Sequence, residues 1–327
     1  MTDAERRGTP PIALVLGITG GAGEAIARAL QAHGWRIRAL HRDPDQARAG
    51  LPWLTDAQWL QGDAGRAADV LGAATGTGVI VHAVNPPGYR NWRELALPML
   101  ENTIAAARAS GARILFPGNI YNFGPDAWPV LREDSPQNPQ TDKGAVRVEM
   151  ESRLAAAANG GARTIVIRAG DFFGSRARGS WLAAAMVKPG RPVRSVTYPG
   201  ARSVGHAWAY LPDFAETFAQ VAAREASLPD FDRYHFGGHW VEPGIEMADS
   251  IRRACGRPDL AVRSMPWWFM RLAAPLVPFF RELNEMRYLW FESIRLDNHK
   301  LTALLGQEPH TPLDQAVRRT LDELGCL

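Results

Sequence analysis

The sequence predicts an α/β protein built on a doubly wound parallel sheet. Three observations lead to this fold class: a glycine-rich turn between an apolar run and a helix-forming segment, an alternation of strand-like and helix-like segments, and a length of 327 residues. Strands and helices that alternate at this spacing form parallel sheets covered on both faces. A chain of this length also has room for a second, smaller lobe.

The predicted elements succeed one another up to about residue 170. The first strand enters the glycine turn at residues 14–23, LVLGITGGAG, and a helix follows at 24–34. Later strands are predicted at 35–40, 57–63, 78–84, 112–118 and 163–170, and later helices at 44–51, 66–74, about 92–110 and 144–160. Proline-rich turns then weaken the alternation. We therefore predict a Rossmann-type domain at 11–175 and a smaller substrate lobe at 176–327, which exchanges elements with the first domain in some arrangements.

The glycine turn is typical of a site that binds phosphate through the backbone. Glycine is needed because a β-carbon would hold a pyrophosphate away from the backbone N–H groups, and the next helix N-terminus supplies partial positive charge. The predicted cofactor-binding residues of the turn are Gly17, Thr19, Gly20, Gly21, Ala22 and Gly23. The alternative is a glycine-rich surface turn that binds nothing.

The end of the second strand distinguishes the two nicotinamide dinucleotides. A site for NAD usually carries Asp or Glu there, to bind the ribose 2′-hydroxyl, whereas this chain continues His41-Arg42-Asp43-Pro44. The guanidinium of Arg42 suits a 2′-phosphate in charge and geometry. Asp43 competes for the ribose, but Pro44 behind it predicts that Asp43 caps the next helix. We predict NADP(H), with NAD(H) less favoured.

The composition argues against a nucleic-acid partner and against a metal site. The net charge is +3 and basic residues alternate with acidic ones, so no basic block is present for a nucleic acid. Cys255 and Cys326 lack metal-site spacing, so we expect reduced thiols and no metal. The segment MTDAERRGTPP has no apolar core, which predicts a cytoplasmic protein. The expected partners are a small-molecule substrate and, at most, a second copy in a homodimer.

The turn and several later segments resemble the short-chain dehydrogenase/reductase superfamily, in particular its extended and atypical branch, which includes NAD-dependent epimerases and dehydratases. GITGGAG at 17–23 is similar to the branch's GxxGxxG, and Gly62-Asp63 to its adenine-binding pair. Further similar segments are Val81-His82-Ala83, Arg168-Ala169-Gly170 to Gly174, His206 to Asp213, Leu296-Asp297 and Leu304-Leu305-Gly306. The resemblance covers most of the chain. It implies cofactor contacts at Asp63, Ala64, His82, Ala83, Val84, Lys143 and Ala169.

The chain departs from the superfamily in its catalytic signature. The superfamily uses a Tyr as the proton donor, a Lys four residues later, and a Ser or Thr that orients the substrate oxygen. FPGNIYNFG at 116–124 is similar to the superfamily's FSSxxxxYG, which puts Asn119 at the Ser position. Alignment of the next helix on Glu151 puts Lys143 at the Tyr position and Arg147 at the Lys position. No Tyr precedes a Lys by four residues in the sequence, so we do not expect an unmodified short-chain mechanism.

Two residues stand as candidate proton donors. Tyr121 follows the fifth strand at the sheet edge where open parallel sheets bind ligands, and its alternative is a packed aromatic side chain. Lys143 is one of three lysines in a chain that otherwise uses arginine. An ammonium can act as an acid and a guanidinium cannot, but a solvated lysine at a helix start fits equally well.

Arg147 and His82 each have two interpretations. Arg147 fits a contact with ribose or a substrate carboxylate, or a surface ion pair with Glu151. His82 ends an apolar strand, where a satisfied, half-buried histidine is commoner than a catalytic base.

The substrate is expected at the carboxyl edge of the sheet, where a second lobe closes the site. The predicted contacts are Asp171, Phe172, Trp181, His206 and Trp268. The apolar stretch 265–280 is too short and too often broken by proline to span a bilayer. It fits core packing of the second lobe, the wall of an apolar pocket, or an interfacial lid.

Three functions fit these patterns. An NADP(H)-dependent oxidoreductase acting on a small to medium, partly apolar substrate agrees with both fold and cofactor chemistry. An epimerase or dehydratase is less favoured because its transient oxidation relies on the missing Tyr and Lys. An NADP-sensing regulatory protein without turnover is favoured by the same loss.

Overall fold

A computed structural model describes residues 10–86, 92–174, 177 and 179–327. Contacts divide the chain into two compact units that interleave along the sequence. Unit 1 contains the chain up to Gly118, Val146–Arg168 and Phe214–Tyr234, and unit 2 contains Asn119–Ala145, Ala169–Asp213 and His235–Leu327. A division into continuous domains at residue 175 stays a prediction.

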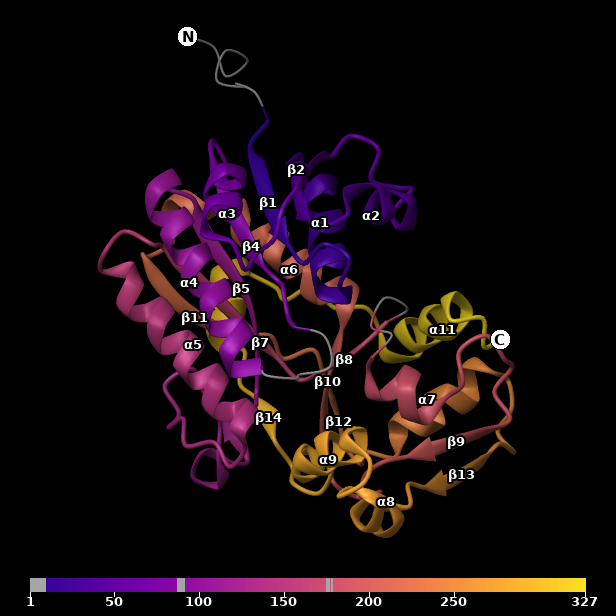
Figure 1. The fold of residues 1–327 in the computed structure, drawn as a ribbon. Coiled ribbons are helices and arrows are strands. Elements are labelled where there is room, and N and C mark those ends of the chain that lie inside the picture. The colour runs from indigo at the N-terminus through magenta and orange to yellow at the C-terminus, as the bar shows by residue number, and fades with distance from the viewer. Residues whose placement is uncertain (1–9, 87–91, 175–176, 178) are drawn as a thin grey trace. The chain divides into compact units, whose positions relative to one another are not determined.

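Unit 1 is built on a seven-stranded sheet with the strand order β11-β7-β5-β4-β1-β2-β3 (Figure 1). Its strands are β1 (Ile12–Leu16), β2 (Arg36–His41), β3 (Gln58–Gln61), β4 (Val79–His82), β5 (Arg113–Asn119), β7 (Thr164–Ala169) and β11 (Phe231–His235). Strand β1 pairs in parallel with both β2 and β4, so the winding direction reverses between β1 and β4. In open parallel sheets, ligands bind beside such a reversal, outside the carboxyl ends of the strands. The predicted α/β fold is confirmed.

Helices cover the sheet because successive strand residues point to opposite faces. The helices with residues in unit 1 are α1 (Gly21–Ala32), α2 (Pro44–Gly50), α3 (Ala67–Ala74), α4 (Trp92–Ser110), α5 (Asp142–Ala158) and α6 (Leu211–Ala222). On one face, Leu14 and Ile80 of the strands join one buried cluster with Leu100 of α4 and Met150 of α5. Helix α1 packs against β1 and β2.

A buried ion pair fastens α5 to β7. Arg168 is 0% exposed and Glu151 is 1% exposed, and Arg168 Nε donates to Glu151 Oε1 at 3.0 Å. Arg233 Nε lies 3.3 Å from the other carboxylate oxygen, Oε2. Glu151 is thus an anchor between secondary-structure elements, since a carboxylate this buried requires charged partners.

Unit 2 contains short sheets and helices. Strand β10 (His206–Tyr210) pairs in parallel with β8 (Asp171–Phe173) and antiparallel with β12 (His239–Val241). The other parallel pairs are β9 (Ser195–Tyr198) with β13 (Ala261–Ser264) and β6 (Val130–Leu131) with β14 (Arg295–Leu296). The helices are α7 (Glu246–Ala254), α8 (Trp267–Ala273), α9 (Pro278–Glu285), α10 (His299–Leu305) and α11 (Leu313–Glu323), with single turns at η2 (Pro125–Ala127), η3 (Leu182–Met186) and η5 (Arg287–Trp290). Among the described residues of unit 1, a further single turn is η4 (Glu225–Ser227).

Two features of the described residues bear on possible partners. Within the described ranges, no helix combines the length and apolar character that crossing a membrane requires. The same residues contain no group of three or more His, Cys, Asp or Glu side chains placed to hold a metal ion.

Candidate functional site

The glycine turn between β1 and α1 is held by close backbone packing. Gly17 has φ +86°, and a β-carbon there would lie 2.6 Å from the carbonyl oxygen of Ala83. A β-carbon on Gly23 would lie 2.2 Å from Gly17 O. Gly17 and Gly23 are therefore required by the fold itself.

Gly20 differs from those two glycines. Its backbone is extended (φ −82°, ψ 154°), and the nearest atom to a β-carbon there would be Gly17 O at 3.3 Å. Gly20 and Thr19 are exposed, and Gly21 and Ala22 are half-buried. No side chain caps α1 at Gly20. The turn therefore presents an accessible helix N-terminus, which is the geometry that binds an anion.

In the segment after β2, Arg42 is exposed and the carboxylate of Asp43 is engaged in a hydrogen bond. Asp43 Oδ1 accepts from the backbone N–H of Gln46 at 3.0 Å and caps α2, with Pro44 in the first turn. The predicted cap is confirmed. The backbone N–H of Asp43 donates to His41 Nδ1 at 3.0 Å. The carboxylate nearest the end of β2 is thus already engaged in a local structural role.

Asp63 and Ala64 follow β3 at the same sheet edge. Asp63 Oδ1 accepts from the N–H of Gly65 at 2.8 Å, and the N–H of Asp63 donates to Asp69 Oδ2 at 2.9 Å. Asn102 donates to the carbonyl of Ala64 at 2.9 Å. These bonds fix the loop where the resemblance implies the adenine.

His82 ends β4 and is 3% exposed. Its Nδ1 lies 2.8 Å from Thr103 Oγ1, and the ring stacks on Phe116. Burial, with a smaller contribution from Arg147, lowers the pKa of His82 to about 3, so the ring is neutral. The backbone atoms of the next two residues, Ala83 and Val84, pack against Gly17.

Arg147 is held over aromatic rings in unit 1. Its guanidinium carbon lies 5.2 Å from the ring centroid of Trp92 and 5.6 Å from that of Phe116. Its Nη1 donates to Pro117 O at 3.3 Å. Arg147 therefore fixes a positive charge beside the carboxyl end of β5.

Three of the predicted catalytic residues lie in unit 2. Asn119 ends β5, and its Oδ1 accepts from the N–H of Tyr121 at 3.0 Å. The backbone of Tyr121 adjoins the start of α5, since a β-carbon on Gly144 would lie 2.3 Å from Tyr121 O. Lys143 is 7% exposed, and its Nζ lies 3.2 Å from Glu285 Oε2. The structure thus brings Asn119, Tyr121 and the start of α5 into one small region.

Asp171 and His206 form a buried pair, with His206 Nε2 2.9 Å from Asp171 Oδ2. His206 Nδ1 lies 3.0 Å from the carbonyl oxygen of Leu289. Both ring nitrogens of His206 thus lie within hydrogen-bond distance of an oxygen atom. The ring stacks on Trp290 with centroids 3.9 Å apart, and Trp181 contacts the same indole at 5.2 Å.

The remaining predicted residues lie on β7, β8 and α8. Phe172 is half-buried on β8, and Ala169 is buried at the end of β7. Trp268 lies on α8 with 73% of its surface exposed and contacts Phe269 edge-on.

The structure adds two residues that the sequence analysis did not single out, Glu285 and Tyr288. Burial, and then the carboxylates of Asp171 and Glu285, raise the pKa of Tyr288 well above its usual value. Tyr288 also stacks on Trp128 with centroids 5.5 Å apart. Its hydroxyl therefore remains protonated as a hydrogen-bond donor. No spacing rule could have identified these residues, because Glu285 lies 142 positions from Lys143.

Glu285 and Tyr288 line a cavity of about 440 Å³ in unit 2. The residues around this cavity are Gln140, Thr141, Arg271, Asn284, Glu285, Arg287, Tyr288, Phe291 and Glu292. Lys143 contacts Glu285, one of the residues that line this cavity. The cavity combines aromatic and charged groups, as small-molecule sites do.

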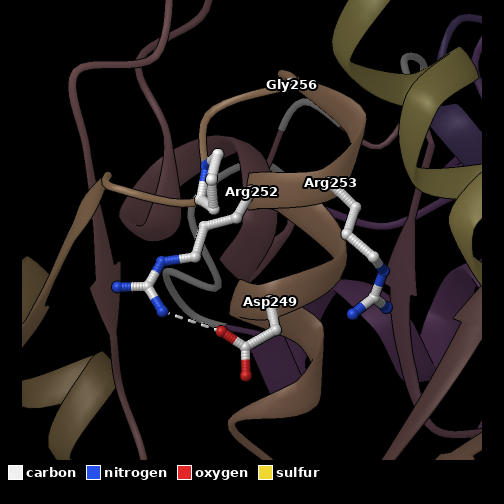
Figure 2. A pocket seen from close by; sticks show the side chains of 5 residues that line it. Asp249, Arg252, Arg253 and Gly256 are labelled. Atoms are coloured by element: carbon white, nitrogen blue, oxygen red, sulfur yellow. Dashed lines mark hydrogen bonds and ion pairs between the residues drawn. The ribbon is translucent and has the colours of Figure 1, made fainter.

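A second pocket, of about 410 Å³, lies on α7 (Figure 2). Its lining residues are Asp249, Arg252, Arg253, Gly256 and Pro258, none of which was a predicted site residue. Arg252 donates to Asp249 at 2.9 Å, and Arg253 Nε donates to Asp314 at 2.8 Å. Because both guanidiniums have carboxylate partners, this pocket is a weak candidate for an anion.

The fold is similar to that of several solved enzymes. A nucleoside-diphosphate-sugar epimerase from Pseudomonas aeruginosa is 19% identical, with 96% of this chain and 97% of that chain covered and a TM-score of 0.73. The UDP-Glc/GlcNAc 4-epimerase from Campylobacter jejuni is 15% identical, with 96% and 99% covered and a TM-score of 0.73. A UDP-glucuronic acid 4-epimerase from Bacillus cereus, in complex with NAD, is 14% identical, with 96% and 98% covered and the same score. At these identities the likeness concerns the fold.

Sequence comparison gives the family directly. A search of curated proteins found no match. The sequence profile described as the NAD dependent epimerase/dehydratase family matches residues 13–237, which includes the glycine turn, β4 and α5. The chain therefore belongs to the NAD dependent epimerase/dehydratase family, a family of nicotinamide-dinucleotide enzymes.

Proposed function

We propose that the protein is an NADP(H)-dependent oxidoreductase that acts on a small to medium, partly apolar substrate without the Tyr-x-x-x-Lys pair. The observation that carries the proposal is the exposed Gly20 at the N-terminus of α1, which no side chain caps. That geometry suits a pyrophosphate, and family membership supports a nicotinamide dinucleotide as its source.

The preference for NADP(H) rests on the residues after β2. Asp43 is committed to capping α2, which weakens it as a partner for a ribose hydroxyl. Arg42 is exposed beside it and would pair with a 2′-phosphate. A Bacillus cereus relative of the same fold is described in complex with NAD, so this preference would be a property of this chain rather than of the fold.

The chemistry proposed for this chain is protonation of a substrate oxygen. The cofactor, when bound, supplies a hydride to a carbonyl carbon, and the oxygen then needs a proton. Lys143 or Tyr121 would deliver it, and Glu285 would hold the Lys143 ammonium in place. The Oδ1 of Asn119 accepts from the N–H of Tyr121. Its Nδ2 would then donate to a substrate oxygen.

The substrate would lie near Asp171, Phe172, Trp181, His206 and Trp268, or in the cavity lined by Tyr288. Aromatic rings around charged groups fit a partly apolar molecule that carries a carbonyl. We place the activity in the cytoplasm, as predicted from the sequence.

Epimerization or dehydration is the second candidate, because the family and the described relatives carry out that chemistry. Sugar-nucleotide turnover would favour it. The absence of the Tyr and Lys pair makes it the weaker choice.

A turnover panel tests the proposal. NADPH oxidation is measured with aldehydes, ketones, enones and imines, and product is measured separately with UDP-sugars. We expect oxidation with at least one carbonyl class and none by a Gly20→Val variant. Tight NADPH binding with no turnover on any compound would replace the proposal with a sensor role, and UDP-sugar conversion alone would replace it with epimerization.

A further inference from the structure

The cavity of about 440 Å³ in unit 2 has a surplus of positive charge among its lining residues. Two arginines, Arg271 and Arg287, and two glutamates, Glu285 and Glu292, line it. Helix α8, which carries Arg271, contacts α9 (Figure 1), and α9 contacts η5, which carries Arg287. Glu285 is balanced by Lys143, whose Nζ lies 3.2 Å from Glu285 Oε2. Two guanidinium groups therefore remain against a single carboxylate, that of Glu292.

Arg287 is a cation held in place without a counter-ion. Its guanidinium carbon lies 3.9 Å from the ring centroid of Phe291 and 5.8 Å from that of Trp267. Within the described ranges, Arg287 forms no ion pair, and its buried Nε has no hydrogen-bond acceptor. A guanidinium that lies over a ring keeps its in-plane N–H groups, which match the two oxygens of a carboxylate.

Tyr288 adds a neutral donor to the same cavity. Burial, and then the carboxylates of Asp171 and Glu285, keep the pKa of its hydroxyl well above the usual value, so the proton is retained. Its ring is fixed by stacking on Trp128. Among the described residues this hydroxyl has no hydrogen-bond partner, so it is available to a bound oxygen atom.

Asn284 contributes a second buried polar atom without a partner. Its Nδ2 donates to Phe280 O at 2.8 Å, which fixes the side-chain amide. Its Oδ1 is buried and accepts no hydrogen bond from the described residues. Most buried polar atoms in proteins are hydrogen-bonded, so unpartnered atoms on two lining residues, Asn284 and Arg287, mark the cavity as a place for a polar molecule.

A carboxylate fits the charge of this cavity better than a phosphate or an ammonium group does. A carboxylate carries a single negative charge, which offsets the surplus left by Arg271, Arg287 and Glu292. A phosphate monoester carries a charge of about −1.5 to −2, so it would leave negative charge uncompensated beside Glu292. An ammonium group would increase the positive surplus.

We infer that this cavity binds the carboxylate of the substrate, with Arg287 as its main partner and Arg271 and Tyr288 as further donors, and that the substrate is an oxo acid. The carbonyl part of this inference rests on the proposed oxidoreductase function, whereas the carboxylate part does not. The carbonyl carbon accepts a hydride from NADPH and its oxygen accepts a proton from Lys143 or Tyr121. The oxo acid thereby becomes a hydroxy acid as NADPH becomes NADP⁺.

Calorimetry without cofactor tests the carboxylate site by itself. The probe is phenylacetate, which has a carboxylate and an apolar ring but no carbonyl that a hydride could reduce. We expect phenylacetate to bind at least about tenfold more tightly than phenylacetamide, because the amide loses the charge-assisted hydrogen bonds. No binding of phenylacetate at millimolar concentration would overturn the inference. Tighter binding of phenyl phosphate or of phenethylamine would also overturn it.

Matched variants locate the bound carboxylate. Arg287→Gln should weaken phenylacetate binding at least about tenfold, and Arg271→Gln roughly threefold, because Arg271 is exposed. Glu292→Gln should strengthen binding about two- to fivefold, because it removes a repelling charge. Arg281→Gln is the control, because Arg281 is exposed on α9 and does not line the cavity.

Tyr288→Phe provides a test that does not depend on the fold of the Arg287 variant. It keeps the ring that stacks on Trp128 and removes only the hydroxyl, so binding should weaken about threefold or more. Thermal melting of each variant checks that the fold is retained. Wild-type affinity in both Arg287→Gln and Tyr288→Phe would place the carboxylate elsewhere and overturn the inference.

Turnover separates this inference from the proposed function. Phenylpyruvate and benzoylpropionate are compared with their methyl esters in NADPH oxidation, and kcat/KM should be at least about tenfold higher for the acids in wild type but not in Arg287→Gln. Equal use of acids and esters by wild type would overturn the inference and leave the proposed activity standing. Binding of phenylacetate without NADPH oxidation on any oxo acid would refute the proposed activity and support the carboxylate site alone.

Discussion

Lys143 and Glu285 are 142 positions apart in the sequence, yet the carboxylate of Glu285 contacts Lys143 twice. Oε1 accepts from the backbone N–H of Lys143 at 3.2 Å, and Oε2 lies 3.2 Å from its Nζ. The side chain of Lys143 is 9% exposed and that of Glu285 is 24% exposed. The sequence was compatible with a solvated Lys143 at the start of a helix. In the structure, Glu285 holds Lys143 in one orientation.

The first prediction concerns the proton donor. Lys143→Met keeps most of the side-chain stem and removes the charge, so turnover should fall about 10²- to 10⁴-fold while NADPH affinity stays nearly unchanged. Tyr121→Phe keeps the ring and removes only the hydroxyl, so the same loss of turnover is expected if Tyr121 is the donor. Steady-state kinetics and calorimetry measure the two effects. Lys188→Met, at an exposed lysine, is the control.

Glu285→Gln distinguishes Lys143 from Tyr121. If Lys143 is the donor, loss of the carboxylate that holds its ammonium should lower turnover and leave NADPH affinity nearly unchanged. Wild-type rates in both Lys143→Met and Tyr121→Phe would exclude both residues and leave His82 or water as the proton source.

The second prediction concerns cofactor choice. Arg42→Ala should weaken NADPH binding by roughly 1.5 to 3 kcal/mol, the contribution of a charge-assisted hydrogen bond, and leave NADH binding unchanged. Calorimetry with both nucleotides measures the difference. Arg48→Ala removes an exposed arginine from the neighbouring helix and should change neither affinity. Equal wild-type affinities for the two nucleotides would refute the role of Arg42.

The third prediction concerns the glycine turn. Gly20 has a backbone that valine adopts without strain, so Gly20→Val should fold and yet lose both NADPH and NADH, because its side chain fills the space that a pyrophosphate would occupy. Gly72→Val is the control, since a β-carbon at Gly72 meets no atom within 4 Å. Retained affinity with a normal melting temperature would mean that the phosphate binds elsewhere.

The fourth prediction concerns stability in acid. His82 has a pKa of about 3 when folded and about 6.5 when unfolded, so between these values the unfolded state binds more protons and stability falls as pH falls. His82→Asn removes the titration, and the slope of unfolding free energy against pH should decrease by up to about 1.4 kcal/mol per pH unit. Denaturant titrations from pH 7 to pH 4 measure the slope.

The exposed His299 supplies the control for that experiment. His299→Asn should leave the slope much closer to wild type, because this side chain is 93% exposed. An unchanged slope in His82→Asn would show that His82 titrates normally in the folded protein.

Local patterns in the sequence were sufficient for the sheet and the glycine turn. The turn at residues 17–23, the cap at Asp43 and the alternation of strands and helices up to β7 each depend on residues a few positions apart. Such signals report hydrogen-bonding needs and side-chain periodicity, which neighbours in the chain satisfy among themselves. The sheet and the glycine turn between β1 and α1 could therefore be predicted.

Tertiary structure decided the rest. The chain returns at Phe214–Tyr234 to complete unit 1, and Glu285 meets Lys143 across 142 positions. Trp290 stacks on His206, and Tyr288 lies close enough to Asp171 for the carboxylate to raise its pKa. These contacts depend on how distant segments pack, and no periodicity or spacing along the chain encodes that packing. A single sequence therefore predicted the sheet and its glycine turn, whereas the surroundings of the candidate proton donors Lys143 and Tyr121 emerged only from the folded chain.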